Sequence, residues 1–200
     1  MAGGHQPRCG FINEDMAKGK HGMPPKTNVA RLLDKAHIAY ELIPYEVDEN
    51  NLAADHVASQ LGEDIRQVFK TLVLQGEYPG RNSARSNAAG YFVCVVPGDA
   101  EVDLKKGAKA AGAKKADLIP MKELLPLTGY IRGGCSPVGM KKPFPTFFHS
   151  TALDFDYIFV SAGVRGLQVK VSPRELIEYV GGEVCDLVHA DGQNLEEDEL

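Results

Sequence analysis

Two apolar runs, VFKTLVLQ at residues 68–75 and YFVCVVP at residues 91–97, set the frame of the fold. Both are short and rich in Val, Leu and Phe, a composition that favours buried strands. The segment between them, GEYPGRNSARSNAAG at residues 76–90, is polar and rich in the Gly, Pro, Asn and Ser residues of turns. We therefore predict an antiparallel hairpin with a long tip.

The chain on both sides of this hairpin mixes helical and strand patterns. Apolar periodicity and capping residues predict helices at residues 26–36, 52–62, 103–112, 121–127 and 172–182. Strands are predicted at residues 39–47, 144–150, 157–163, 167–171 and 183–188. The last helix starts with Ser172, Pro173 and Glu175, the spacing of a capping box. Irregular interleaving of strands and helices predicts an α+β fold with a mixed, largely antiparallel sheet.

The length of 200 residues predicts one compact domain. Residues 1–25 lack periodicity, which predicts a flexible N-terminal extension. Residues 191–200 form an acidic tail, so the folded domain is expected over residues 26–190.

The composition limits where in the cell the protein is expected and which partners it can be expected to bind. The four cysteines form no Cys-x-x-Cys pair, and no apolar run reaches the length of a membrane span, so we expect a cytoplasmic protein without a membrane partner. The net charge of -5 argues against a surface that coats DNA. A basic group formed by Arg132, Lys141 and Lys142 is either a solvated face or a contact for a few phosphates.

The glycine-rich stretch GYIRGGCSPVGMKKPFPTFF at residues 129–148 is the first candidate site. Its small residues Gly133, Gly134, Cys135 and Ser136 can turn main-chain amides toward one point and bind a carbonyl oxygen or an oxyanion. Pro137 would stiffen such a cradle.

A thiol enzyme is an alternative use of the same loop. Cys135 would be the nucleophile, with His149 or His56 as base, but a small buried thiol is the commoner role for such a cysteine. No HExxH motif or cysteine–histidine cluster is present in the sequence, so no metal site is predicted. The stretch GGCSPVG also lacks the Walker pattern, which argues against a phosphate-binding loop of that type.

Lys70 is the second candidate, because it interrupts the apolar run VFKTLVLQ and is followed directly by Thr71. A lysine on a half-exposed strand usually points to water. The flanking apolar residues also allow it to project into a cleft.

Several stretches together carry a family resemblance: KTNVARLLDKAHIAYEL, QVFKTLV, VDLKKGAKAAGAKKADL, LTGYIRGGCSPVGMKKPFPTFF and YIFVSAGVRGLQVKV. In this order they resemble the YbaK-type Cys-tRNA(Pro) deacylases, stand-alone relatives of the editing domain of prolyl-tRNA synthetase. The resemblance runs from about residue 26 to about residue 188. It implies a barrel-like mixed sheet with surrounding helices, and an enzyme that removes cysteine wrongly attached to tRNA(Pro).

The resemblance also implies roles for individual residues. It places the catalytic lysine at Lys70 and the glycine whose backbone contacts substrate at Gly133. Residues expected to bind the substrate are Tyr45, Thr71, Gly134, Cys135, Ser136, Pro137 and Gln168. Residues expected to contact the acceptor end of the tRNA are Arg132, Lys141 and Lys142, and prolyl-tRNA synthetase is a further candidate partner.

Two positions depart from the family pattern and bear on specificity. Ala53 replaces a phenylalanine that lines the pocket of Cys-specific relatives, and Gln168 replaces an acidic residue. The implied chemistry is attack by the substrate's own thiol, which requires no cofactor. The alternatives are a deacylase that clears alanine or another small residue by water attack, and a non-catalytic module that binds tRNA or a synthetase.

Overall fold

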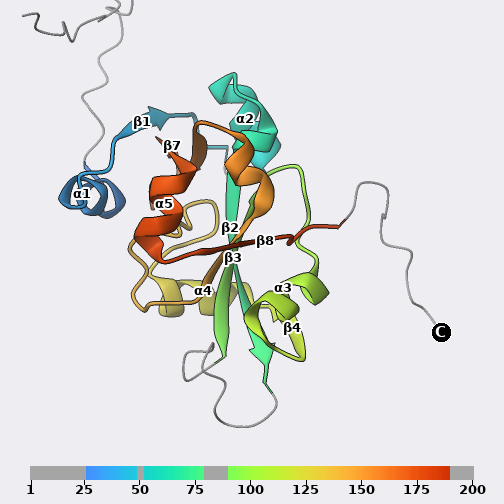
Figure 1. Cartoon of the computed structure of the whole chain (residues 1–200). Helices are drawn as coiled ribbons and strands as arrows, with labels where there is room; N and C mark the ends of the chain where they lie inside the picture. The colour runs from blue at the N-terminus through green and yellow to red at the C-terminus, as the bar shows by residue number, and fades with distance from the viewer. Residues whose placement is uncertain (1–25, 49–51, 79–89, 190–200) are drawn as a thin grey trace, which may run out of the picture.

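The structure is a computed structural model that describes residues 26–48, 52–78 and 90–189 (Figure 1). The predicted N-terminal extension and the acidic tail lie outside the described residues, as does most of the predicted hairpin tip. No helix within the described ranges is long and apolar enough to cross a membrane.

The described chain contains five α-helices and eight strands. The helices are α1 (Asn28–Lys35), α2 (Ala54–Leu61), α3 (Leu104–Ala111), α4 (Met121–Thr128) and α5 (Pro173–Val180). The strands are β1 (Tyr40–Pro44), β2 (Phe69–Glu77), β3 (Tyr91–Pro97), β4 (Lys115–Leu118), β5 (Thr146–His149), β6 (Ile158–Ser161), β7 (Leu167–Val171) and β8 (Glu183–Cys185). Every predicted helix and strand is confirmed, whereas β4 was not predicted.

The missed strand and one helix start have local explanations. Strand β4 is short and polar, and it forms an edge of its sheet with Lys115 and Asp117 exposed, so its sequence carries little strand signal. The predicted capping box at α5 is wrong, because the Ser172 side chain makes no capping hydrogen bond. Ser172 takes the N-cap position through its carbonyl oxygen alone, which accepts from the amide of Leu176 at 3.0 Å.

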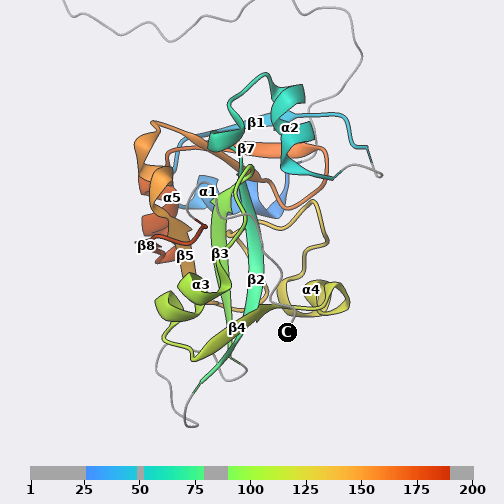
Figure 2. The same cartoon turned by 90° about the vertical axis from the view of Figure 1, so that its right-hand side faces the viewer.

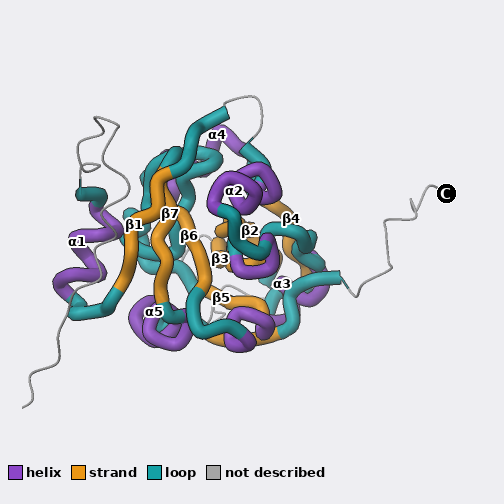
Figure 3. The backbone as a smooth tube through the Cα atoms, turned by 90° about the horizontal axis from the view of Figure 1, so that it is seen from above, coloured by secondary structure: helices purple, strands orange, loops and turns teal. Residues whose placement is uncertain are grey.

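The strands divide between two sheets that meet side by side. The larger sheet has the order β4-β2-β3-β5-β8 and the smaller has the order β1-β7-β6. A bridge between Val68 and Phe159 brings the start of β2 next to β6, as Figure 3 shows from above. Four pairs are antiparallel, and only β3–β5 and β5–β8 are parallel. The mixed, largely antiparallel α+β architecture is confirmed, and its wall is barrel-like without closing into one sheet.

The central hairpin β2–β3 is buried on both faces. Phe69, Val73, Val93 and Val95 join the main core together with residues of α1, β6, β7 and α5. Alternate residues, among them Leu74, Phe92 and Cys94, pack into a second core that includes residues of α3. Two buried faces explain why both strands are apolar runs rather than alternating ones.

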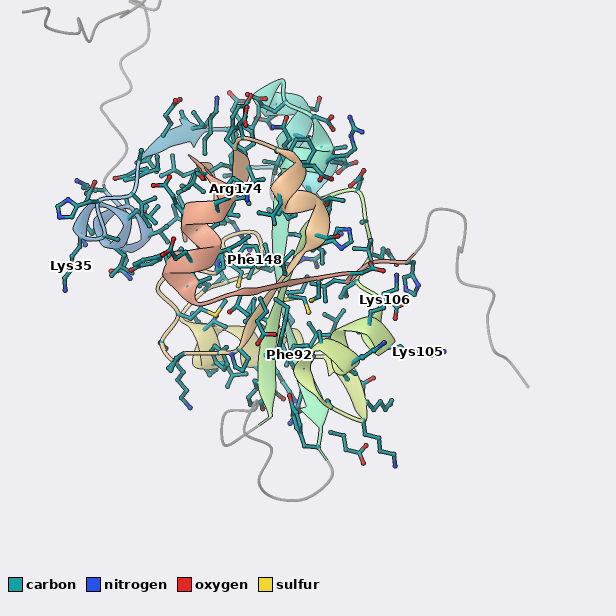
Figure 4. The ribbon with its side chains drawn as sticks, viewed as in Figure 1. Lys35, Phe92, Lys105, Lys106, Phe148 and Arg174 are labelled. Atoms are coloured by element: carbon teal, nitrogen blue, oxygen red, sulfur yellow. The ribbon has the colours of Figure 1, made fainter. Side chains whose placement is uncertain are left out.

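The side chains in Figure 4 follow this division. Phe92 and Phe148 are fully buried and lie within the protein, whereas Lys35 and Lys105 extend outward from α1 and α3. Phe92 stacks edge-on against Phe147, with ring centroids 6.0 Å apart. The second core is thus anchored by an aromatic pair between β3 and β5.

The two core faces predict a sharp contrast between two paired leucines. Leu74 of β2 is 0% exposed, and its register partner Leu118 of β4 is 51% exposed. Leu74→Ala should lower the free energy of unfolding by about 2 to 5 kcal/mol through the cavity it leaves. Leu118→Ala should lower it by less than about 1 kcal/mol. Urea denaturation of both variants tests this, and equal losses would contradict the two-faced burial of β2.

Candidate active site

The site lies where the two sheets separate along one edge of β2. That edge of the strand pairs with β4 only from Leu74 onward, and Val68 ahead of the strand bridges to β6. Residues 69–73 between these points have no strand partner on this edge within the described chain. A pocket of about 900 Å³ lies against this stretch. Figure 2 shows α2 above the upper end of β2 and α4 to the right of the strand.

The pocket gathers residues that are far apart in the sequence. From the predicted set it is lined by Tyr45, Lys70, Thr71, Arg132, Gly133, Cys135 and Gln168, and also by Ala53. The fold therefore brings together both catalytic candidates and one of the three predicted tRNA contacts. The part played by each residue in the reaction stays a prediction.

Lys70 is half-buried at the edge of β2. Its Nζ donates a hydrogen bond to the carbonyl oxygen of Gly98, 3.2 Å away in the turn after β3. Burial lowers the pKa of the Lys70 ammonium, and the nearby carboxylates of Glu101 and Asp99 partly offset this effect. A cation held by one main-chain carbonyl keeps further donor capacity for a ligand in the pocket.

Two buried polar side chains in the pocket wall have unused hydrogen-bonding capacity. Thr71 on β2 is 9% exposed and Gln168 on β7 is 6% exposed. The Thr71 hydroxyl and the Gln168 side-chain carbonyl oxygen have no hydrogen-bond partner in the described structure. Leaving such groups unpaired costs free energy, so a polar ligand that satisfies them gains affinity.

The glycine loop contributes one wall through its backbone. Gly133 has φ +80°, which favours glycine, and a Cβ there would lie 3.4 Å from Leu52 and 3.5 Å from Arg165. Arg165 fixes the loop, because its Nε donates to the carbonyl oxygen of Arg132 at 2.9 Å. The Gly134 amide donates to the carbonyl oxygen of Ile131 at 3.0 Å. Among the described residues, no hydrogen bond takes the amides of Gly133 or Cys135.

Cys135 lines the pocket but is poorly suited to be a nucleophile. Burial raises the pKa of its thiol to about 12, so the thiolate is scarce near neutral pH. Neither proposed base lines the pocket. His149 lies on β5, where its Nδ1 accepts from the amide of Leu187 at 3.1 Å, and His56 on α2 contacts Gln60. The structure does not assemble the thiol enzyme considered as an alternative.

Five predicted residues do not line the pocket: Gly134, Ser136, Pro137, Lys141 and Lys142. The first three are buried, and the Ser136 hydroxyl accepts from the amide of Val138 at 3.3 Å. Lys141 and Lys142 are exposed, and Lys141 donates to the carbonyl oxygen of Leu125 at 3.4 Å. The sequence predicted a cradle of four successive amides, but only Gly133 and Cys135 of these residues line the pocket. Their two amides are therefore the ones that remain candidates for binding an oxygen atom.

Sequence reasoning missed several residues of the pocket wall. Ser161 lies beside Gln168 in the β6–β7 register, and Asp99 follows β3. Ile119, Met121 and Leu124 form an apolar wall at the start of α4. Only the pairing of β4 with β2 brings this wall to the site, and β4 itself was not predicted. No group of three or more metal-ligating side chains occurs among the residues that the structure describes.

Comparisons with known proteins show the family of this chain. Residues 48–179 match the model of the aminoacyl-tRNA editing domain. EbsC of Enterococcus faecalis, named as a candidate Cys-tRNA(Pro)/Cys-tRNA(Cys) deacylase, is 40% identical over 86% of this chain and 98% of its own length. YwhH of Bacillus subtilis, an uncharacterized protein, is 25% identical over 67% of this chain and 78% of its own length.

A solved structure shows the same fold at lower sequence identity. It is the crystal structure of a candidate trans-editing enzyme for prolyl tRNA synthetase. It superposes with a TM-score of 0.68 at 22% identity, covering 84% of this chain and 100% of the other. With the match over residues 48–179 and the likeness to EbsC, the chain belongs to the aminoacyl-tRNA editing domain family.

Proposed function

We propose that this chain is a trans-editing aminoacyl-tRNA deacylase that removes cysteine from mischarged tRNA(Pro). Membership of the editing domain family and the 40% identity to EbsC support deacylation of aminoacyl-tRNA. Cysteine and proline are close in size, so a synthetase pocket rejects one by only a modest factor and a second site becomes necessary. Prolyl-tRNA synthetase, which makes the mischarged tRNA, is the corresponding candidate partner.

Two properties of the pocket carry this proposal: it contains buried polar groups without hydrogen-bond partners, and its cysteine thiol is protonated near neutral pH. The Gln168 carbonyl oxygen can accept from the α-ammonium of an aminoacyl group, and the Thr71 hydroxyl can bond its ester. The Cys135 thiol, with its pKa raised to about 12, does not supply a nucleophile. A site that holds an aminoacyl ester but has no thiolate of its own is suited to a substrate whose side-chain thiol attacks its own carbonyl carbon.

In the proposed reaction, every bond to carbon or sulfur that forms or breaks lies within the substrate. The cysteine sulfur gives up its proton and attacks its own carbonyl carbon, which forms a C–S bond and an oxyanion. The oxyanion then collapses, the C–O ester bond breaks, and the ribose oxygen leaves and takes up a proton. Cysteine departs as a cyclic thiolactone, which water later opens.

The protein's part in this reaction is positioning and charge. Well-oriented intramolecular attack can lower a barrier by about 7 to 11 kcal/mol. The Lys70 ammonium and the amides of Gly133 and Cys135 are the groups that can stabilise the developing oxyanion. Arg132 lies at the pocket and can contact a phosphate of the acceptor end.

The choice of nucleophile predicts the substrate profile. Initial rates with tRNA(Pro) carrying cysteine, serine or alanine should fall steeply in that order, because a hydroxyl ionises far less than a thiol and alanine has no nucleophile. A thiolactone should precede free cysteine. An alanyl rate equal to the cysteinyl rate would assign water attack instead, and no cleavage of any of the three would favour a binding module.

Removal of the Lys70 charge should slow the reaction without unfolding the protein. Lys70→Ala should lower kcat by roughly 10²- to 10³-fold, equivalent to about 2.7 to 4 kcal/mol of transition-state stabilisation. Lys170→Ala is the matched control, because Lys170 is a half-buried strand lysine that sits over the Tyr157 ring, outside the pocket lining. Retention of half the wild-type kcat in Lys70→Ala would remove Lys70 from the mechanism.

The glycine loop should matter through its backbone and not through its thiol. Cys135→Ala should keep most of the activity, whereas Gly133→Ala should lose it, since a φ of +80° disfavours any side chain and the resulting strain shifts the backbone that lines the pocket. Gly62→Ala controls for backbone strain, because Gly62 has φ +67° with nothing within 4 Å of a Cβ. Both glycine variants should lose similar stability in urea, and only Gly133→Ala should lose deacylation. Trapping of an acyl group on Cys135 would contradict this assignment.

A further inference from the structure

We propose that the α4 end of the pocket binds the adenine base of the terminal adenosine of the tRNA. This subsite is formed by Leu118, Ile119, Met121 and Leu124, and is called the α4 wall below. The proposal rests on the proposed function, because it names where the nucleoside next to the scissile ester lies.

The volume of the pocket exceeds what an amino acid needs. Its volume is about 900 Å³. Cavities of ~300–1,000 Å³ hold drug-sized ligands, whereas a cysteinyl group has only a handful of heavy atoms. An aminoacyl-adenosine is of the size that such a pocket holds, so the pocket has room for the nucleoside as well as the amino acid.

The polar groups of the pocket lie between two apolar parts. Lys70 and Thr71 lie near the first end of β2, beside Ser161 and Gln168. On the α2 side the pocket is lined by Leu52, Val57 and Ile65. On the other side, the carbonyl oxygen of Val73 accepts from the amide of Ile119, which fixes the α4 wall to the strand. A strand rises about 3.3 Å per residue, so Lys70 and Val73 lie about 10 Å apart. This spacing suits an amino acid at the polar groups and a base at the α4 wall, which is the more exposed of the two apolar parts.

The α4 wall is open to solvent, as an exit for a polynucleotide must be. Leu118 is 51% exposed and Met121 is 56% exposed. Neighbouring apolar side chains that are this exposed at a pocket mark a binding surface. A flat heteroaromatic base can cover them while its ribose and phosphates remain in water.

The charges at the two ends favour the same direction of exit. Asp55 and Asp99 line the opposite end of the pocket and would repel phosphates. Lys122 is exposed on α4, and Arg132 lines the pocket. Near the α4 wall, the charge of Asp117 is offset by its ion pair with Lys115 at 3.2 Å, whereas Glu123 accepts from the Tyr91 hydroxyl at 3.4 Å and keeps its charge.

Methyl NMR with adenosine as the probe tests the site directly. The chain has five methionines, so ¹³C-methyl labelling gives few signals, and Met121→Gln assigns the relevant one. Adenosine should shift the Met121 methyl saturably through the ring current of the base. Met140, which packs against the main core and does not line the pocket, is the internal control. Equal shifts at both methyls, or no shift at Met121, would overturn the proposal.

Steady-state kinetics with Cys-tRNA(Pro) provide the second measurement. Met121→Gln should raise KM about tenfold with kcat unchanged, because it weakens binding equally in the ground and transition states. Leu125→Gln is the matched control, since Leu125 is 50% exposed on the same helix but does not line the pocket. A wild-type KM in Met121→Gln, with Cys-tRNA(Pro) still cleaved, would refute the adenine subsite and leave the deacylase intact. An adenosine shift at Met121 without cleavage of any charged tRNA would support the nucleoside site and refute the deacylase.

Discussion

The arrangement of this protein depends on one strand, β2, that must satisfy two cores and two sheets at once. Its apolar side chains pack alternately into opposite cores, and among them Lys70 and Thr71 line the pocket. Its outer edge is shared between β6 and β4, which diverge and cannot both follow it. The pocket is the space left by this divergence. A binding cavity thus arises at the seam of the fold, without any cost to the packing on either side.

The same seam explains the character of the site. At a strand edge, side chains from both faces of the sheet reach one cavity, so Lys70 and Thr71 line it together although they are adjacent in sequence. The turn after β3 holds the lysine, and the β6–β7 turn holds the glycine loop through Arg165. Reactive groups are positioned by main-chain carbonyls and not by other catalytic side chains. Such a scaffold is suited to aligning a substrate that carries its own nucleophile.

Local sequence signals predicted most of the elements but only part of the site. Helix ends could be predicted because Thr27 is a typical N-cap residue and Gly62 a typical C-cap residue. The β2–β3 hairpin could be predicted because its two strands are apolar runs. Strand β4 could not be predicted in this way, because its pairing is imposed by β2 and only Ala116 of its four side chains is buried. The α4 wall and Ser161 were missed for the same reason, since only tertiary pairing places them. Lys70 and Gly133 stood out in the sequence itself, as a lysine in an apolar run and as part of a glycine-rich stretch. Gln168, and the roles expected of all three residues, came from the family resemblance, which carries tertiary information that one sequence's periodicity lacks.

The pocket lining also has a consequence for how the protein acquires its activity. It draws on residues from Tyr45 to Gln168, and β1 completes its sheet only by pairing with β7. Contacts of such sequence separation require long loops to close, which slows folding relative to a chain of local contacts. A nascent chain still lacking β7 has neither Gln168 nor the turn that holds the glycine loop. The editing site is therefore incomplete until the chain has been synthesised through β7.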